Sequence, residues 1–329
     1  MKRLRFETNP SLMMPISDRF TSQGYKPPVT KQQAYDMVGN CDLFEAFGFW
    51  APGGDLSVEN VDEITAVVHG YGKEMGTIVF DTWTKLDYKW GCFTSKDARV
   101  RERTVQALCE AKDIAEAAGM KTIVIWLAHD GVDYPFQLDF VKAYDWLVEG
   151  IGRAASYKSD IRLAIEPKIR EPRMHQLVAN IGDAMTLVDE VGIDSVGVCL
   201  DSGHSIIAGE RMSNSAARLL RRGKLYGMHF GDNYRLWDDD VIVGSVNTLE
   251  FLELVYWLRR YDWDGWCSLD QYPFKNDALE ACSESVLWIR GMESLLERIG
   301  MSTFESLLEL DEPKKALSII RQAIFDMKD

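Results

Sequence analysis

Acidic and imidazole side chains stand at or beside the carboxyl ends of four apolar segments in the second half of the chain. These residues are Glu166, Asp201, His229 and Asp270. Carboxylate oxygens with one imidazole suit an oxygen-preferring divalent cation rather than a thiophilic metal. We therefore predict these residues as metal ligands, with Mn²⁺ as the expected ion and Mg²⁺ or Co²⁺ as alternatives. The competing interpretation is that each one pairs with a loop lysine or arginine, because buried charges need a partner.

Five further polar residues could take part in the same site. Lys168 could polarise a substrate oxygen or simply neutralise the carboxylates. His129 could act as a general base, since a neutral imidazole titrates near physiological pH, or it could hydrogen-bond a loop carbonyl. His204 is a candidate second ligand or substrate contact. Asp238 and Asp240 alternate in an acidic loop that could hold a second metal or could be solvated.

Aromatic side chains are frequent in the loops of the first third of the chain. Trp50, Trp83, Trp90 and Phe93 could form a floor against the apolar face of a sugar or against a flat aglycone. Packing at the rim of the fold is the alternative for each of them.

The elements that would position these residues alternate between strand-like and helix-like patterns. The expected strands are Leu4–Thr8, Cys41–Phe47, Thr77–Phe80, Thr122–Leu127, Ile161–Ile165, Ser195–Leu200, Leu225–Phe230 and Gly265–Leu269. The expected helices are Thr30–Val38, one opening at Ser57, Ser95–Ala118, Gln137–Tyr157, Met174–Val191, Arg211–Arg222, Thr248–Arg260, Ala278–Ile299 and Pro313–Asp326.

Such alternation, with about 30–40 residues per unit, predicts parallel strands joined by right-handed crossovers. Eight units favour a closed (β/α)8 TIM barrel over an open sheet, and no GxGxxG motif opens the first unit. We expect one barrel over residues 1–300 and a C-terminal helical arm over residues 301–329. The arm would pack on its own barrel or on a neighbouring subunit.

The composition of the chain indicates which kinds of molecule it binds and in which compartment it works. The net charge of −14 argues against nucleic acid and anionic membranes, which need clustered Lys and Arg. The six cysteines include no CxxC pair, which is typical of free thiols in a reducing compartment. The amino terminus has no signal-peptide core, and no run of eighteen apolar residues occurs. We expect a cytoplasmic protein.

Six segments together resemble the xylose isomerase superfamily of TIM barrels, from about Gly91 to Ser294. They are GCFTSKDARVR, IVIWLAHDG, IEPKIREP, LDSGHSIIAG, WDDDVIVG and SLDQYPFKND. The resemblance implies a metal-binding glutamate at Glu166, a catalytic lysine at Lys168, a Glu…His pair at Asp201 and His204, and further metal ligands at His229, Asp238, Asp240 and Asp270.

Three departures from the isomerase pattern modify this expectation. Phe47-Gly48-Phe49-Trp50 stands where the isomerases carry a ring-opening histidine, which argues against opening of an aldose ring. Asp201 replaces a glutamate that bridges two metals, and His229 replaces an aspartate, so a single metal is favoured.

A single-metal site is more similar to the sugar epimerases of the superfamily, and to the large subunit of the bacterial C-glycoside deglycosidases. That subunit also has a histidine at the position of His129, and it works with a small β-sandwich partner. The resemblance implies cleavage of 3-oxo-C-glucosides by a lyase, with a small β subunit in a hetero-oligomer. An aldose–ketose isomerase or an epimerase is the alternative. A barrel that binds sugar without turnover would have a broken ligand set, whereas this set is intact.

Overall fold

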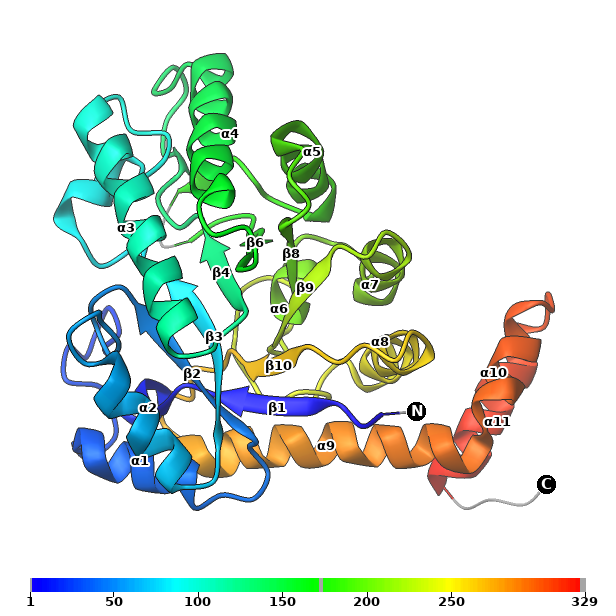
Figure 1. Ribbon diagram of the computed structural model, residues 1–329. Coiled ribbons are helices and arrows are strands. Elements are labelled where there is room, and N and C mark those ends of the chain that lie inside the picture. The colour runs from blue at the N-terminus through cyan, green and yellow to red at the C-terminus, as the bar shows by residue number, and fades with distance from the viewer. Residues whose placement is uncertain (1, 172–173, 326–329) are drawn as a thin grey trace.

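Eight strands close into a parallel barrel in the computed structural model, which describes residues 2–171 and 174–325 (Figure 1). The strand order around the barrel is β1-β10-β9-β8-β6-β4-β3-β2. The bounds are β1 Arg5–Thr8, β2 Ala46–Ala51, β3 Glu74–Phe80, β4 Thr122–Trp126, β6 Arg162–Glu166, β8 Val196–Asp201, β9 Leu225–Phe230 and β10 Trp266–Leu269. The expected closed (β/α)8 fold is confirmed.

Helices surround the barrel, and two short strands pair in its loops. The helices are α1 Lys31–Gly39, α2 Val61–Gly70, α3 Ala98–Ala117, α4 Phe140–Ser156, α5 Ile181–Val191, α6 Ser202–Ile207, α7 Met212–Arg221, α8 Thr248–Arg260, α9 Ala278–Ile299, α10 Met301–Leu308 and α11 Pro313–Phe325, with 3-10 turns η1 Pro10–Met13 and η2 Leu86–Trp90. The short strands β5 Gly131–Val132 and β7 His175–Gln176 are antiparallel. Within the described residues, no helix is both long and apolar enough to cross a membrane.

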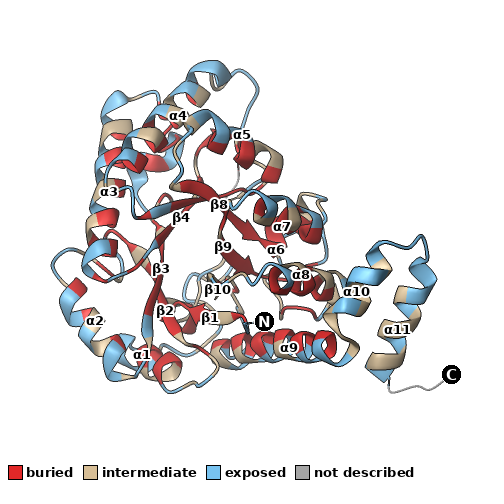
Figure 2. Cartoon of the chain, turned by 45° about the vertical axis from the view of Figure 1, so that its right-hand side comes forward, coloured by how far each residue is buried: buried red, intermediate tan, exposed pale blue. Residues whose placement is uncertain are grey.

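The barrel strands are largely buried on both faces, because one face meets the helices and the other fills the barrel (Figure 2). In β4, Ile123 and Ile125 belong to the large core cluster. Val124 points the other way, as the strand pleat requires, and joins a separate small cluster with Ala164 and Cys199.

The second strand begins five residues later than the sequence predicts. Residues 41–44 form a turn in which the Phe44 amide donates to the Cys41 carbonyl over 3.4 Å. The Lys73 ammonium donates to the carbonyls of Cys41 and Phe44 over 2.9 and 2.8 Å, a distant contact that the local pattern does not contain. Trp50, expected in a loop, therefore lies in β2 opposite Val79.

Some helices begin later than predicted. The expected helix from Met174 starts only at Ile181, because His175 and Gln176 pair with β5 and the Asn180 side chain caps the helix. The cap of α3 is Asp97 rather than Ser95. The predicted cap at Thr30 is confirmed, in a capping box with Gln33.

The C-terminal arm, α10 and α11, extends from the end of α9 away from the barrel (Figure 1). Neither helix contains a buried residue. Phe304 packs on Tyr256 of α8 with 5.5 Å between ring centroids, and Arg298 donates to the Ala323 carbonyl. Asp326, the expected last helical residue, lies outside the described residues.

Candidate metal centre and active site

The four predicted metal ligands meet at the carboxyl ends of neighbouring strands. Glu166 ends β6, Asp201 ends β8, His229 lies in β9, and Asp270 follows β10. The Oε1 atom of Glu166 is 3.1 Å from the Nδ1 atom of His229. That nitrogen is 3.7 Å from Oδ2 of Asp270. Glu166, His229 and Asp270 thus lie together, whereas the group of potential ligands that contains Asp201 includes His204 in place of His229.

His204 joins the same cluster. Asp201 caps the short helix α6, because its Oδ1 atom accepts a 2.7 Å hydrogen bond from the His204 amide. This cap turns the imidazole inward, where its Nδ1 lies 3.4 Å from Oε1 of Glu166 and 3.9 Å from Oδ1 of Asp201. Potential ligand atoms of Glu166, Asp201, His204 and Asp270 all lie within 4.8 Å of one another.

Asp238 connects this cluster to Lys168. Its Oδ2 atom is 2.9 Å from the Lys168 ammonium and 3.2 Å from Nε2 of His204. Lys168 also contacts Glu171 and is only 6% exposed. A Cβ at Gly203 would lie 2.8 Å from Oδ1 of Asp238, so glycine permits this close approach. Asp240, the other residue predicted for a second metal, lies near Gly231.

A buried carboxylate anchors the loop that carries Asp238 and Asp240. Asp232 is fully buried and accepts hydrogen bonds from the amides of Val246 and Asn247 over 2.9 and 3.1 Å. Its neighbour Asn233 donates to the Gly203 carbonyl over 3.0 Å. Sequence reasoning did not single out either residue.

The cluster has an excess of negative charge. Burial raises the pKa of Asp201 to about 7, with Asp238 and Glu166 adding to the shift and His204 opposing it. Burial lowers the pKa of His204, but the carboxylates of Asp201 and Asp238 together outweigh that effect and raise the pKa to about 9. Burial and the nearby Asp238 carboxylate also raise the pKa of Asp240 well above its usual range.

Two imidazole nitrogens of the cluster have no hydrogen bond. Nδ1 of His204 and Nε2 of His229 are buried without a hydrogen-bond partner among the described residues. Buried polar atoms are ordinarily satisfied, and crowded carboxylates repel one another unless a cation or proton neutralises them. The donors are oxygens and imidazole nitrogens, as a divalent cation requires. The residues present therefore fit a divalent metal ion.

His129 lies beside a row of tryptophans. Its Nε2 is 3.4 Å from the Trp83 carbonyl, so the tautomer that donates there leaves Nδ1 free to accept a proton. Trp83 contacts Trp50 and Trp126, with ring centroids 5.9 and 5.6 Å apart. The Lys168 ammonium lies 5.1 Å from the centre of the Trp126 ring. The Trp50, Trp83 and Trp126 row therefore adjoins the charged cluster.

The sequence pattern does not predict Trp126 as a site residue, because a tryptophan at a strand end is an ordinary core residue, although it pairs in register with Glu166. Asp130 was also missed. It is fully buried and accepts from the amides of Cys92 and Thr94 over 2.9 and 2.8 Å, which fixes the loop beside β4.

Two other aromatic residues predicted as substrate contacts, Phe93 and Trp90, are not part of the ring contacts that join Trp50, Trp83 and Trp126. Phe93 is 1% exposed and packs against Phe80, with 6.4 Å between ring centroids. A ring buried to this extent has almost no surface for a ligand, and Phe93 is a core residue. Trp90 is 60% exposed at the end of η2.

Comparison with known families agrees with this architecture. A family model described as "Xylose isomerase-like TIM barrel" matches residues 40–292. The chain belongs to this family. The xylose isomerases of Thermus thermophilus and Thermus caldophilus are each 26% identical to it over 212 residues, which is 63% of this chain and 55% of theirs. The match thus spans about half the length of these curated relatives.

Solved structures of sugar epimerases share the fold. The 3-keto-D-glucoside 4-epimerase of E. coli superposes with a TM-score of 0.65 and 16% identity, covering 88% of this chain and 100% of the other. An L-ribulose 3-epimerase superposes with a TM-score of 0.67 and 13% identity, covering 91% and 98%. At these identities the likeness establishes the xylose isomerase-like fold.

Proposed function

We propose that this xylose isomerase-like protein is a divalent-metal-dependent enzyme that cleaves the carbon–carbon glycosidic bond of 3-oxo-C-glucosides. The observation that carries the proposal is the arrangement of His129. It lies outside the metal cluster, its tautomer is set by the Trp83 carbonyl, and a row of tryptophans suited to a flat aglycone lies beside it. The fold shared with a 3-keto-D-glucoside epimerase supports an oxidised sugar as the substrate.

The proposed ligands of the cation are Glu166, Asp201, His229 and Asp270, with His204 within reach. When bound, a divalent cation would polarise the substrate carbonyl and stabilise negative charge that develops on its oxygen. Lys168 is proposed to hold a sugar oxygen, because burial lowers its pKa but the charges of Asp238 and Glu171 outweigh burial and keep it protonated. The carboxylates that hold Lys168 also fix its position.

The reaction is a β-elimination with no net oxidation. His129 removes the proton from C2, next to the C3 carbonyl, or alternatively activates a phenol of the aglycone. The electron pair released at C2 forms a double bond to C1, and the bond from C1 to the aryl carbon breaks. The aryl carbon takes up a proton, so that the free aglycone and an unsaturated oxidised sugar are the products.

An aldose–ketose isomerase or a sugar epimerase is the second candidate. The curated xylose isomerases and the epimerase structures favour it. These reactions begin with the same proton abstraction but return the proton to the neighbouring carbon or to the opposite face of the same carbon. They need no space for an aryl group, so the products distinguish the candidates.

The proposal includes a small β subunit and hence a hetero-oligomer. The exposed arm formed by α10 and α11 supports it, since its apolar side chains at Leu308, Leu317 and Phe325 are more than half exposed. Exposed apolar patches commonly mark contacts with other proteins.

The test is an assay on a 3-oxo-C-glucoside and on free aldoses and ketoses, with the Mn²⁺-supplemented chain alone and with a small β subunit added as the proposed partner. We expect aglycone release that is lost on chelation. His129→Ala is expected to lower kcat/KM about 100- to 10,000-fold, as loss of a general base does, while exposed His69→Ala has no effect. Conversion of free sugars with the aryl glucoside left intact would refute cleavage and support the second candidate.

A further inference from the structure

A thiol lies inside the barrel directly beside the proposed metal cluster. Cys199 belongs to β8 and is fully buried. It faces Gly227 of β9, where a Cβ atom would lie 3.0 Å from the cysteine sulfur. Glycine at this position therefore leaves room for the thiol in the barrel interior.

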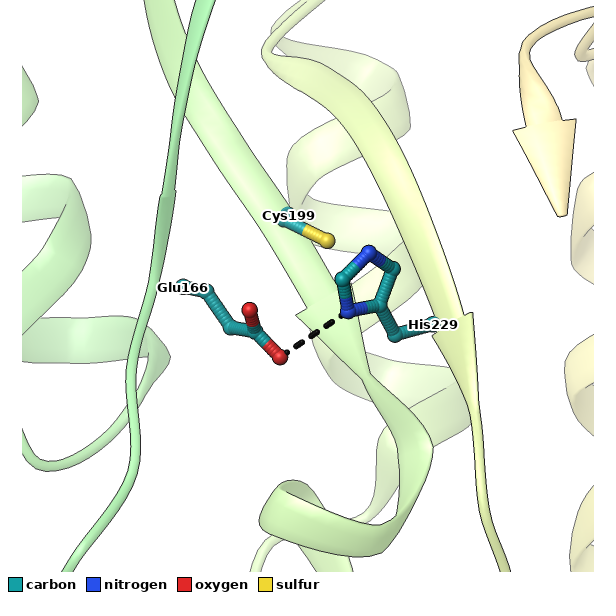
Figure 3. Close-up of side chains that lie close together, drawn as sticks. All are labelled: Glu166, Cys199 and His229. Carbon is teal, nitrogen blue, oxygen red and sulfur yellow. Dashed lines mark hydrogen bonds and ion pairs between the residues drawn. The ribbon is translucent and has the colours of Figure 1, made fainter. Parts of the chain in front are cut away.

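Glu166, Cys199 and His229 point toward one another from three consecutive barrel strands (Figure 3). One potential ligand atom from each lies within 4.8 Å of the others. His229 is 4% exposed, and its Nε2 atom has no hydrogen-bond partner among the described residues. The Cys199 thiol and the His229 imidazole interact directly, and three buried donor atoms that converge on one point suit a metal ion.

The donors of this group differ in chemistry from those of the neighbouring group. Sulfur, imidazole nitrogen and one carboxylate oxygen are typical ligands of zinc and of similar thiophilic cations. The neighbouring group of Glu166, Asp201, His204 and Asp270 has three carboxylates and no sulfur. Both groups contain Glu166, so the two sites compete for the same carboxylate.

We propose that Glu166, Cys199 and His229 form a second, inner metal site for a thiophilic divalent cation such as Zn²⁺ or Cd²⁺. Occupation of the inner site withdraws Glu166 from the oxygen-rich site, so a thiophilic ion displaces Mn²⁺ and inhibits the enzyme. The competition part of this inference rests on the proposed function, whereas the inner site itself does not. Binding transfers the thiol proton to solvent and involves no change in oxidation state.

The first experiment detects sulfur ligation directly, with Cd²⁺ as the probe. Cys41 and Cys109 are partly exposed, so the background protein carries Cys41→Ser and Cys109→Ser. We expect one cadmium per chain and an ultraviolet thiolate-to-cadmium charge-transfer band. Adding Cys199→Ser or Cys199→Ala should abolish the band, while Cys282→Ser, which removes a buried cysteine of α9, should leave it unchanged. Circular dichroism checks that each variant is folded.

The second experiment measures competition. Electron paramagnetic resonance follows release of Mn²⁺ from the loaded protein as Cd²⁺ is added. Because loss of one thiolate ligand weakens binding of a thiophilic ion, Cys199→Ser should raise the cadmium concentration for half-release about tenfold or more, whereas Cys282→Ser should not.

The outcomes separate the two proposals. A band that persists in folded Cys199→Ser and Cys199→Ala, or the absence of any band in the background protein, overturns the inner site. A Cys199-dependent band in a protein that binds no Mn²⁺ supports the inner site and contradicts the proposed function. Release of Mn²⁺ at the same cadmium concentration in all variants overturns the competition.

Discussion

At the scale of single residues, Lys168 connects the metal cluster to the substrate side of the site. Lys168→Met would leave the carboxylates of Asp238 and Glu171 without their ammonium partner. Because the Lys168–Asp238 pair is buried, we expect the free energy of unfolding to fall by about 3 kcal/mol, as measured by urea denaturation at neutral pH. The exposed pair of Lys142 with Asp139 is the control, and Lys142→Met should leave the free energy of unfolding nearly unchanged. Equal losses in the two variants would show that the buried pair is not stabilising.

The same variant has a predictable pH dependence. The raised pKa of Lys168, which the charges of Asp238 and Glu171 cause against the effect of burial, gives stability that is complete below the ordinary value of 10.5. Burial would raise the pKa of Asp238, but His204 and Lys168 hold it well below its ordinary value of 3.8, and the stability it gives is lost only as the pH falls below that value. The deficit of Lys168→Met should therefore shrink as the pH falls below 3.8 or rises above 10.5.

The sequence predicted the residues of the cluster because their positions at strand ends follow from local patterns. Trp126 and Cys199 escaped prediction for another reason. A tryptophan at a strand end and a cysteine within a strand are both ordinary core residues, and only the register of β4 with β6 and of β8 with β9 places them beside Glu166 and His229. Phe93 shows the converse error, since an aromatic residue in a loop was assumed to be accessible although its ring is buried.

At the scale of elements, Glu7 ties three strands together inside the barrel. It lies in β1 and accepts a 2.7 Å hydrogen bond from the Thr77 amide of β3, and it also contacts the hydroxyls of Thr77 and of Ser268 in β10. Burial raises the pKa of Glu7 above its ordinary value of 4.5, although the hydrogen bonds from Ser268 and Thr77 oppose the shift.

Glu7→Gln tests this buried carboxyl through its pH dependence. Below pH 4.5 the Glu7 carboxyl is protonated in both the folded and the unfolded chain, and it does not lower the free energy of unfolding. As the pH rises above 4.5, Glu7 ionises first in the unfolded chain. The free energy of unfolding then falls until the carboxyl of the folded protein ionises as well. Glutamine does not titrate. The stability of Glu7→Gln relative to the unmodified protein should therefore increase as the pH rises above 4.5 in urea denaturation. Exposed Glu63→Gln should show no such trend, and a flat difference for Glu7→Gln would contradict the raised pKa.

The boundaries of elements were predicted less well than their order. The shift of β2 depends on Lys73, which lies about thirty residues away from the turn that it caps. The late start of α5 depends on pairing between β5 and β7, whose two-residue strands have no periodic pattern. Such contacts between distant segments form only in the assembled barrel, and local propensity cannot contain them.

At the scale of the whole molecule, the strict alternation of eight strands with helices was enough to predict a closed barrel, because parallel strands joined by helices have few other arrangements. The arm is different, since nothing in its amphipathic pattern says what it covers. Its apolar side chains at Leu308, Leu317, Ile324 and Phe325 are exposed. With Leu249, Leu287 and Trp288 near it, Ile324 lines an apolar hollow of about 350 Å³ between the arm and α8 and α9.

Removal of residues 301–329 should separate folding from association. The barrel closes through contacts between β1 and β10 that do not involve the arm, and the arm contains no buried residue. We expect the truncated chain to fold, with a loss of about 1 kcal/mol because the contact between Phe304 and Tyr256 disappears. Light scattering should show that the full chain associates, with itself or with the proposed small subunit, and that the truncated chain does not. Deletion of residues 326–329 alone is the control. Unfolding of the truncated chain would mean that the arm belongs to the barrel's own core, and unchanged association would place the contact surface elsewhere.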